Sequence, residues 1–137
     1  MTAGCAGEDK LTGSSGTPRD KYEVYKKKYE GCTYIEKSLV IVHLYMRDLA
    51  VSNASYYDIG FLKDIREVHD YVLIQENIID VTPLWNLSVI RGVNLYDKKY
   101  SLYVEHNLIG ELQLKSLKGS LNVYSVGHCI YYSNQQL

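Results

Sequence analysis

The strongest constraint on this chain is a series of short apolar runs, rich in leucine and β-branched residues and separated by polar stretches. Runs of this length and composition are typical of buried β-strands. Short strands joined by polar turns predict the stacked coils of a β-solenoid, although the unequal spacing here argues against a regular repeat. The five runs are Leu39–Val42, Val72–Ile74, Leu87 with Val89, Leu102 with Val104, and Ile130 with Tyr132.

Successive residues of a strand point to opposite faces, so alternate positions in these runs should share one interior. Between the first two runs, Phe61, Ile65 and Val68 have the spacing of one amphipathic helical stretch, and residues 45–58 are expected to form a surface loop. The residues predicted to form one continuous apolar core are Leu39, Ile41, Val72, Ile74, Leu87, Val89, Leu102 and Val104.

A helix is predicted near the N-terminus, over about residues 18–30. Thr17 can act as its N-cap, Pro18 suits the first turn, and Asp20 stands where a capping box needs an acid. Gly31 can end the helix. One aromatic face of this helix consists of Tyr22, Tyr25 and Tyr29.

The composition favours a binding domain over an enzyme. A chain of 137 residues has room for one domain, and a net charge of -1 gives no reason to expect nucleic acid as a partner. The chain contains 14 tyrosines against one phenylalanine and one tryptophan. Tyrosine is frequent on half-buried β-surfaces and at wet interfaces, which indicates a β-rich extracellular or recognition domain.

The sequence contains no motif for catalysis, metal binding or cofactor binding. Glycine-rich phosphate loops, C-x-x-C and H-E-x-x-H are all absent. Adjacent residues His128 and Cys129 would point to opposite faces of a strand, which is poor geometry for one metal. A nucleophilic pair of Cys129 with a distant histidine would need an activated thiol, whereas an apolar strand position favours a buried one. We therefore expect no metal and no cofactor.

Three cysteines cannot all pair within one chain. Cys5 and Cys32 flank 26 residues, a comfortable disulfide loop, which leaves Cys129 as a buried thiol or bonded to a residue outside this chain. Sequons at Asn53 and Asn86 are candidate glycosylation sites and indicate secretion. Residues 1–16 hold no hydrophobic signal segment, so we expect an extracellular domain of this sequence to be a fragment without its signal peptide.

Several ordered motifs cover nearly the whole chain. They are Cys5-x-Gly7, Gly16-Thr17-x-x-Asp20, Leu39-x-Ile41, Phe61-Leu62-Lys63-x-Ile65-x-Glu67-Val68, Tyr71-Val72-Leu73-Ile74, Pro83-Leu84-x-Asn86-Leu87-x-x-Ile90-Arg91-Gly92 and Tyr100-x-Leu102-x-Val104. In this order they resemble the first receptor L domain of EGF-receptor tyrosine kinases. The insulin-receptor L domain shares the Asn86-to-Gly92 motif and is the nearest alternative. The 27-residue step from Cys5 to Cys32 resembles the EGF-receptor branch.

The resemblance implies a mainly β fold, a right-handed β-solenoid with an N-terminal capping helix. It implies one L domain over residues 1–137, with coils over about 33–137, and a cysteine-rich module after it. It also implies a disulfide between Cys5 and Cys32 and an extracellular position on a plasma-membrane receptor. The implied function is half of a clamp around an EGF-like polypeptide, with other ectodomain modules and a receptor dimer as partners. Kinase activity would belong only to a longer parent protein.

The resemblance places a ligand-binding face on the chain. The stretch Leu11 to Gly16, which includes Ser14, matches a segment whose backbone pairs with a ligand strand. Asp97 matches an acid that meets a basic ligand residue, and Lys115 stands where the family has an arginine. A lysine there cannot reproduce the bidentate fork of arginine.

Other positions of this face depart from the family pattern. His43 stands at an aromatic contact position, Glu76 replaces an apolar contact, and Glu105 with His106 replaces an apolar–polar pair. Acids where a ligand normally packs apolar surface predict either a more basic ligand or a domain that has lost ligand binding.

Two further functions remain open on this evidence. One is a secreted or divergent L-domain binding protein without a kinase, and the other is an insulin-receptor-like module. The transcript beyond Leu137 would distinguish the EGF-receptor-like receptor from the secreted protein, because a cysteine-rich module, a membrane span and a kinase would identify the receptor.

Overall fold

A computed structural model describes residues 4–8, 17–45, 59–105, 107–114, 116–117, 121–126 and 129–134. Within these residues, helix α1 spans Pro18–Tyr29 and the 3-10 helix η1 spans Gly60–Leu62. The strands are β1 (Gly4–Cys5), β2 (Tyr34–Ile35), β3 (Leu39–Val42), β4 (Glu67–Val68), β5 (Val72–Gln75), β6 (Ile78–Pro83), β7 (Val89–Ile90), β8 (Leu102–Glu105), β9 (Leu108–Gln113), β10 (Leu121–Val126) and β11 (Cys129–Asn134).

Helix α1 begins and ends as the sequence predicts. The Thr17 hydroxyl accepts from the backbone N–H of Asp20 at 3.2 Å, and the N–H of Thr17 donates to the Asp20 carboxylate at 3.0 Å. This reciprocal capping box lowers the pKa of Asp20, chiefly through the bond from the Thr17 backbone. Glu30 is the C-cap, and Gly31 follows at φ 76°, a left-handed conformation that glycine adopts without strain.

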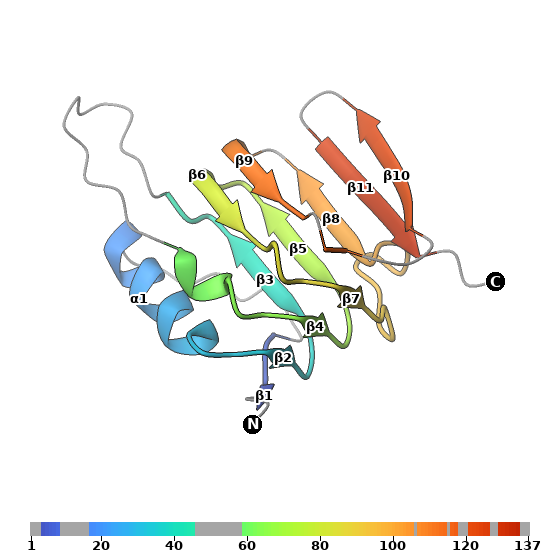
Figure 1. Cartoon of the computed structure of the whole chain (residues 1–137). Coiled ribbons are helices and arrows are strands. Elements are labelled where there is room, and N and C mark those ends of the chain that lie inside the picture. Colours follow the sequence, from blue (N-terminus) through green and yellow to red (C-terminus); the bar gives the residue numbers. More distant parts are fainter. Residues whose placement is uncertain are drawn as a thin grey trace.

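Three sheets run along the molecule, with α1 covering one end (Figure 1). Sheet 1 has the order β1-β2-β4-β7, sheet 2 the order β10-β11-β8-β5-β3, and sheet 3 consists of β6 and β9. Equivalent residues of successive coils pair in parallel, so Leu39 pairs with Val72 and Val72 with Leu102. The chain visits sheets 1, 2 and 3 in turn and then repeats, which is the stacked-coil arrangement expected from the short apolar runs.

The strands β10 and β11 depart from this parallel stacking. The fifth apolar run lies in a strand as predicted, since Ile130 and Tyr132 belong to β11. However, β11 runs antiparallel to β8, with Ile130 opposite Val104, and β10 runs antiparallel to β11. Consecutive strands joined by a two-residue connection can pair only as an antiparallel hairpin, so the coil pattern does not extend through this pair.

Between sheets 1 and 2 lies one hydrophobic core. It contains seven of the eight predicted positions, and Val89 is the exception. The prediction assumed one strand through residues 87–89, whereas β7 begins at Val89, and Leu87 is buried in the turn before it. Strand alternation therefore starts at β7 itself, and Ile90, paired with Val68, faces the core.

The predicted helical stretch from Phe61 to Val68 is mostly wrong. Only Gly60–Leu62 forms a 3-10 helix, and Val68 lies in strand β4. Phe61, Ile65 and Val68 are nevertheless all buried in the core. Apolar spacing identified the buried residues correctly, but a turn followed by a two-residue strand presents the same spacing as a helix.

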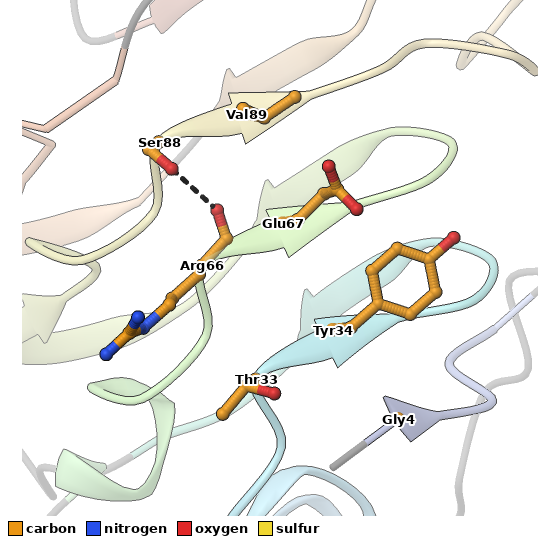
Figure 2. A pocket seen from close by; sticks show the side chains of 7 residues that line it. All are labelled: Gly4, Thr33, Tyr34, Arg66, Glu67, Ser88 and Val89. Carbon is orange, nitrogen blue, oxygen red and sulfur yellow. Dashed lines mark hydrogen bonds between the residues drawn. The ribbon is translucent and has the colours of Figure 1, made fainter. Parts of the chain in front are cut away.

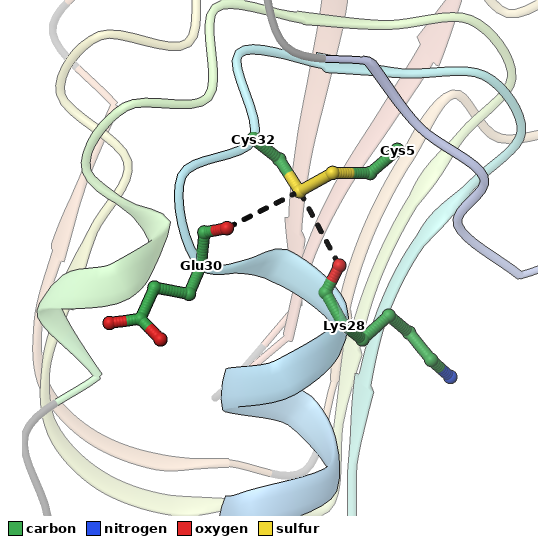
Figure 3. Close-up of a disulfide and its surroundings, with 4 residues drawn as sticks. All are labelled: Cys5, Lys28, Glu30 and Cys32. Atoms are coloured by element: carbon green, nitrogen blue, oxygen red, sulfur yellow. Dashed lines mark hydrogen bonds between the residues drawn. A yellow bond between two sulfur atoms is a disulfide. The ribbon is translucent and has the colours of Figure 1, made fainter.

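The disulfide between Cys5 and Cys32 is present, with Cα atoms 5.8 Å apart (Figure 3). It links β1 to the segment that leaves α1. The Cys32 Sγ also lies 3.4 Å from the carbonyl oxygen of Lys28. Because a disulfide sulfur carries no hydrogen, this is a packing contact. An ion pair between Lys28 and Glu8 further ties the helix to the N-terminal segment.

Hydroxyl groups of α1 cover the edge of sheet 2. The Tyr25 hydroxyl donates to the Val42 carbonyl at 2.9 Å and accepts from the Val42 N–H at 3.1 Å. The Tyr29 hydroxyl accepts from the N–H of Val40 at 3.2 Å. Among the described strands β3 is the edge of this sheet, so the two tyrosines satisfy backbone groups that a neighbouring strand would otherwise pair. Burial raises the pKa of both tyrosines.

An asparagine ladder fixes the corner between sheets 2 and 3. The buried Asn77 amide donates to the Ile41 carbonyl and accepts from the Leu44 N–H, each at 2.9 Å. Asn107 occupies the equivalent corner of the next coil, where its amide donates to the Ile74 carbonyl and accepts from the Asn77 N–H, again at 2.9 Å. These bonds hold the ends of β3, β5 and β8 in register, and three of the predicted ligand residues, His43, Glu76 and Glu105, lie at these ends.

Candidate ligand-binding face

The outer face of sheet 2 is the surface that points away from the core. Strand alternation places Val40, Val42 and Leu73 on it, because their neighbours Leu39, Ile41 and Ile74 face inward. These three outer residues form a second buried cluster, against which Tyr71, Tyr96 and Tyr103 pack. The face is therefore apolar near β3 and becomes aromatic and polar toward β8.

His43 and Glu76 follow β3 and β5 at the same corner of successive coils. Both have φ of 54°, an uncommon left-handed conformation for residues other than glycine. The His43 Nδ1 lies 3.0 Å from the Glu76 Oε2, and both side chains are nearly half exposed. The structure thus brings two of the predicted site residues into direct contact.

Glu105 lies at the end of β8 on the outer face, since it pairs with Gln75, whose partner in β3 is Val42. The Tyr103 hydroxyl donates to the Glu105 Oε2 at 2.5 Å, and the Gln75 Nε2 donates to the same oxygen at 3.4 Å. These bonds fix the position of the carboxylate on the sheet. The N–H of Glu76 also donates to the Glu105 carbonyl at 3.1 Å, which connects the two acids through the backbone.

Asp97 lies in the exposed turn before β8. Both Asp97 and the following Lys98 have positive φ, at 50° and 57°. Burial raises the pKa of Tyr96, and the negative charges of Asp97 and Glu105 raise it further. Asp97 and Glu105 therefore act on the same tyrosine, which packs on the outer face of sheet 2. His43, Glu76, Asp97 and Glu105 are thus brought to this face and its rim.

The remaining predicted site residues are divided between other places. Leu11, Ser14, Gly16, Asn53, His106 and Lys115 lie outside the described residues. Asn86 is exposed in the turn before β7, and its amide donates to the Lys63 carbonyl at 2.7 Å. Cys129 is the first residue of β11, and its side chain lies outside the part of the chain that the structure describes.

A cluster of tyrosines is the part of this face that sequence motifs did not identify. The Tyr96 ring lies 5.7 Å from that of Tyr71 and 4.9 Å from that of Tyr103, and Tyr100 lies 5.0 Å from Tyr103 between ring centroids. The excess of tyrosine in the composition was the available signal. It could not show which tyrosines meet, because Tyr71 and Tyr103 both contact Tyr96 only when β5 and β8 are paired.

Sheet 1 carries a separate depression, of about 550 Å³ (Figure 2). Gly4, Thr33, Tyr34, Arg66, Glu67, Ser88 and Val89 line it. Within it the Ser88 hydroxyl donates to the Arg66 carbonyl at 3.2 Å. None of the predicted ligand residues that the structure describes lines this depression, so it is distinct from the described outer face of sheet 2.

Two searches of the described residues gave negative results. No group of three or more histidine, cysteine, aspartate or glutamate side chains is arranged there to hold a metal ion. In the same part of the chain, no helix has the length and apolar character needed to cross a membrane.

Comparison with known proteins agrees with this fold. Residues 31–137 match the family model of the receptor L domain. The chain is 34% identical over 126 residues to the mouse receptor tyrosine-protein kinase erbB-4 and, also over 126 residues, 34% identical to the chicken epidermal growth factor receptor. It is 32% identical over 103 residues to mouse erbB-2.

These alignments cover 86%, 86% and 75% of this chain. They cover only 9%, 16% and 8% of the respective relatives, so the chain corresponds to a small part of each. A receptor L domain is a non-catalytic module of receptor ectodomains. The match over most of the chain, together with the stacked coils and the capping helix, shows that this chain belongs to the receptor L domain family and is an L domain of the EGF-receptor-like kind.

Proposed function

We propose that the chain is the first L domain of an EGF-receptor-like receptor and that it binds an EGF-like polypeptide on the outer face of sheet 2. The observation that carries this proposal is the meeting of His43, Glu76, Asp97 and Glu105 at that face and its rim. Each was assigned to ligand binding from the family pattern alone. Their convergence on one sheet supports a shared binding surface.

The charges of this face indicate the kind of ligand. Glu76, Asp97 and Glu105 contribute three carboxylates, and the turn before β8 adds two exposed cations, Lys98 and Lys99. Such a surface favours a basic polypeptide and speeds its association at low ionic strength. Together with the stretch Leu11 to Gly16 and Lys115, which the resemblance adds, this face would form half of a clamp. The other half would come from a further ectodomain module.

The larger context is part of the same proposal. Residues 1–137 would form one module followed by a cysteine-rich module, in the extracellular part of a plasma-membrane receptor whose kinase lies elsewhere in the parent. Parallel strands joined by crossovers wind right-handed in nearly all proteins, which supports right-handed coils here. Asn86, exposed in its turn, and Asn53 would carry glycans.

The test uses the receptor ectodomain that contains this chain and a panel of secreted EGF-like domains encoded by the same genome. The tightest-binding member is the panel ligand. We expect Asp97→Lys with Glu105→Lys to slow association about tenfold at low salt and to flatten its salt dependence. The control, Glu23→Lys on the exposed side of α1, should leave the association rate and its salt dependence unchanged.

Two outcomes would contradict the proposal. If no panel member binds, the chain is instead a divergent L domain that has lost this ligand class. If a panel member binds and the charge reversal changes neither the rate nor its salt dependence, then ligand binds elsewhere. A stop codon shortly after Leu137 in the transcript would favour a secreted binding protein without a kinase.

A further inference from the structure

Tyr96 and Tyr103 form the centre of an aromatic surface on the outer face. Their ring centroids are 4.9 Å apart with a tilt of 52°, and Tyr71 and Tyr100 extend the cluster on either side. All four side chains are half-buried, so each is packed against the sheet while part of it remains accessible. A surface of this kind offers ring faces to a ligand at a low cost in side-chain entropy.

A fixed carboxylate borders these rings. Glu105 lies two residues after Tyr103 in β8 and therefore on the same face. The Tyr103 hydroxyl and the Gln75 amide both hold its Oε2, which orients the carboxylate beside the aromatic cluster. An aromatic ring next to a carboxylate attracts a cation through two separate effects, the ring quadrupole and the negative charge.

The field at this position is negative. The pKa of Tyr96 is raised first by burial and then by the charges of Asp97 and Glu105, which shows that both carboxylates act at the ring. A cation placed on Tyr96 would therefore meet two negative charges. A planar guanidinium fits better than an ammonium, because it stacks on a ring and binds a carboxylate at the same time.

We propose that Tyr96, Tyr103 and Glu105 form a subsite for an arginine side chain of the polypeptide ligand. This inference rests on the proposed function and adds the chemistry that the ligand must present. It explains how Glu105 is accommodated on a binding face, since the acid would be matched by a cation of the ligand.

The first experiment detects the subsite without the polypeptide. The 137-residue chain is titrated with N-acetyl-arginine amide and with the uncharged analogue N-acetyl-citrulline amide, while NMR follows the side chains of Tyr96 and Tyr103. We expect saturable shifts with the arginine probe, with a Kd on the millimolar scale, and none with citrulline. Glu105→Gln should abolish the shifts, whereas Glu23→Gln on α1 should not.

The second experiment measures the panel ligand on the ectodomain. Tyr103→Phe keeps the ring and removes the hydroxyl that orients Glu105. The affinity of the ectodomain for the panel ligand should therefore fall by about fivefold. Tyr34→Phe is the control, because it removes a similar hydroxyl contact, 3.3 Å from His69, on sheet 1. The arginines of the panel ligand are then replaced one at a time. We expect one replacement after which Tyr103→Phe no longer changes the affinity.

The outcomes separate this inference from the proposed function. If the panel ligand binds but neither Tyr103→Phe nor any arginine replacement alters its affinity, the arginine subsite is wrong and the proposed function stands. If arginine and citrulline amides give equal shifts, the subsite is also wrong. If the arginine probe binds as described but no panel member does, the subsite stands and the assigned ligand class is wrong.

Discussion

Alternate residues of β3, β5 and β8 point to the two faces of sheet 2, and the two faces differ in what they contact. On the inner face, Leu102 and its neighbours in β3 and β5 are fully or almost fully buried, and all are aliphatic. The outer face carries valine and leucine near β3 but Tyr103, Gln75 and Glu105 toward β8. The inner face stabilises the fold, whereas the outer face is partly exposed only on its aromatic and polar side toward β8.

This difference predicts which substitutions affect folding and which affect binding. The largest effect is expected on the inner face. Leu102→Ala should lower the free energy of unfolding by about 2–5 kcal/mol, because it leaves a cavity in the core between sheets 1 and 2. Urea denaturation measures the change.

Glu105→Gln is the matched outer-face variant, three residues along the same strand. It should change the unfolding free energy by only about 0.5 kcal/mol, because the side chain is partly exposed and the glutamine amide oxygen can still accept from Tyr103. Equal losses for Leu102→Ala and Glu105→Gln would mean that the outer face is as structural as the inner one.

An intermediate effect on the unfolding free energy is expected at the corner between sheets 2 and 3. Asn77→Ala removes the partners of the Ile41 carbonyl and the Leu44 N–H, and each buried group left unpaired costs about 1–3 kcal/mol. Urea denaturation should show this loss, and amide hydrogen exchange should be faster at Leu44. Unchanged exchange there would indicate that water replaces the asparagine, so that the ladder contributes little.

A smaller effect, dependent on pH, is expected at the edge of β3. Folding raises the pKa of Tyr25, so the unfolded chain loses this proton first as the pH rises. Its contribution is therefore complete below about pH 10 and declines as the pH approaches the folded-state pKa.

Tyr25→Phe should remove part of this alkaline decline and cost about 1 kcal/mol at neutral pH, through the lost bonds to Val42. Unfolding free energies measured from pH 7 to 11 give both quantities. An alkaline decline of the same size in wild type and variant would show that Tyr25 is not responsible. Tyr29 and Tyr96, whose pKa values burial also raises, should account for the part that remains.

The sequence predicted the inner face well because its signals are local. Thr17 and Asp20 define the start of α1, and alternation within each run identifies Ile41, Ile74 and Val104 as core residues. It failed at Val89, because alternation cannot be extended across the turn that holds Leu87. The direction of β11 was also missed, since apolar runs do not encode which way a strand runs.

The outer face was less predictable because its contacts join residues far apart in the sequence. The resemblance assigned Glu76 and His43, but not the 3.0 Å contact between their side chains, which depends on the stacking of two coil corners. The asparagine ladder of Asn77 and Asn107 was missed for the same reason. Only the register of the coils shows that these residues are neighbours.

The most direct test of the central claim, that the outer face of sheet 2 binds the polypeptide, is site-specific photo-crosslinking. Benzoylphenylalanine replaces either Lys98, exposed beside Asp97, or Arg66, exposed on sheet 1. The ectodomain is then irradiated with the panel ligand, and the covalent adduct is quantified by mass spectrometry. We expect an adduct from position 98 and none from position 66. An adduct from position 66 alone, or equal adducts from both, would contradict the claim.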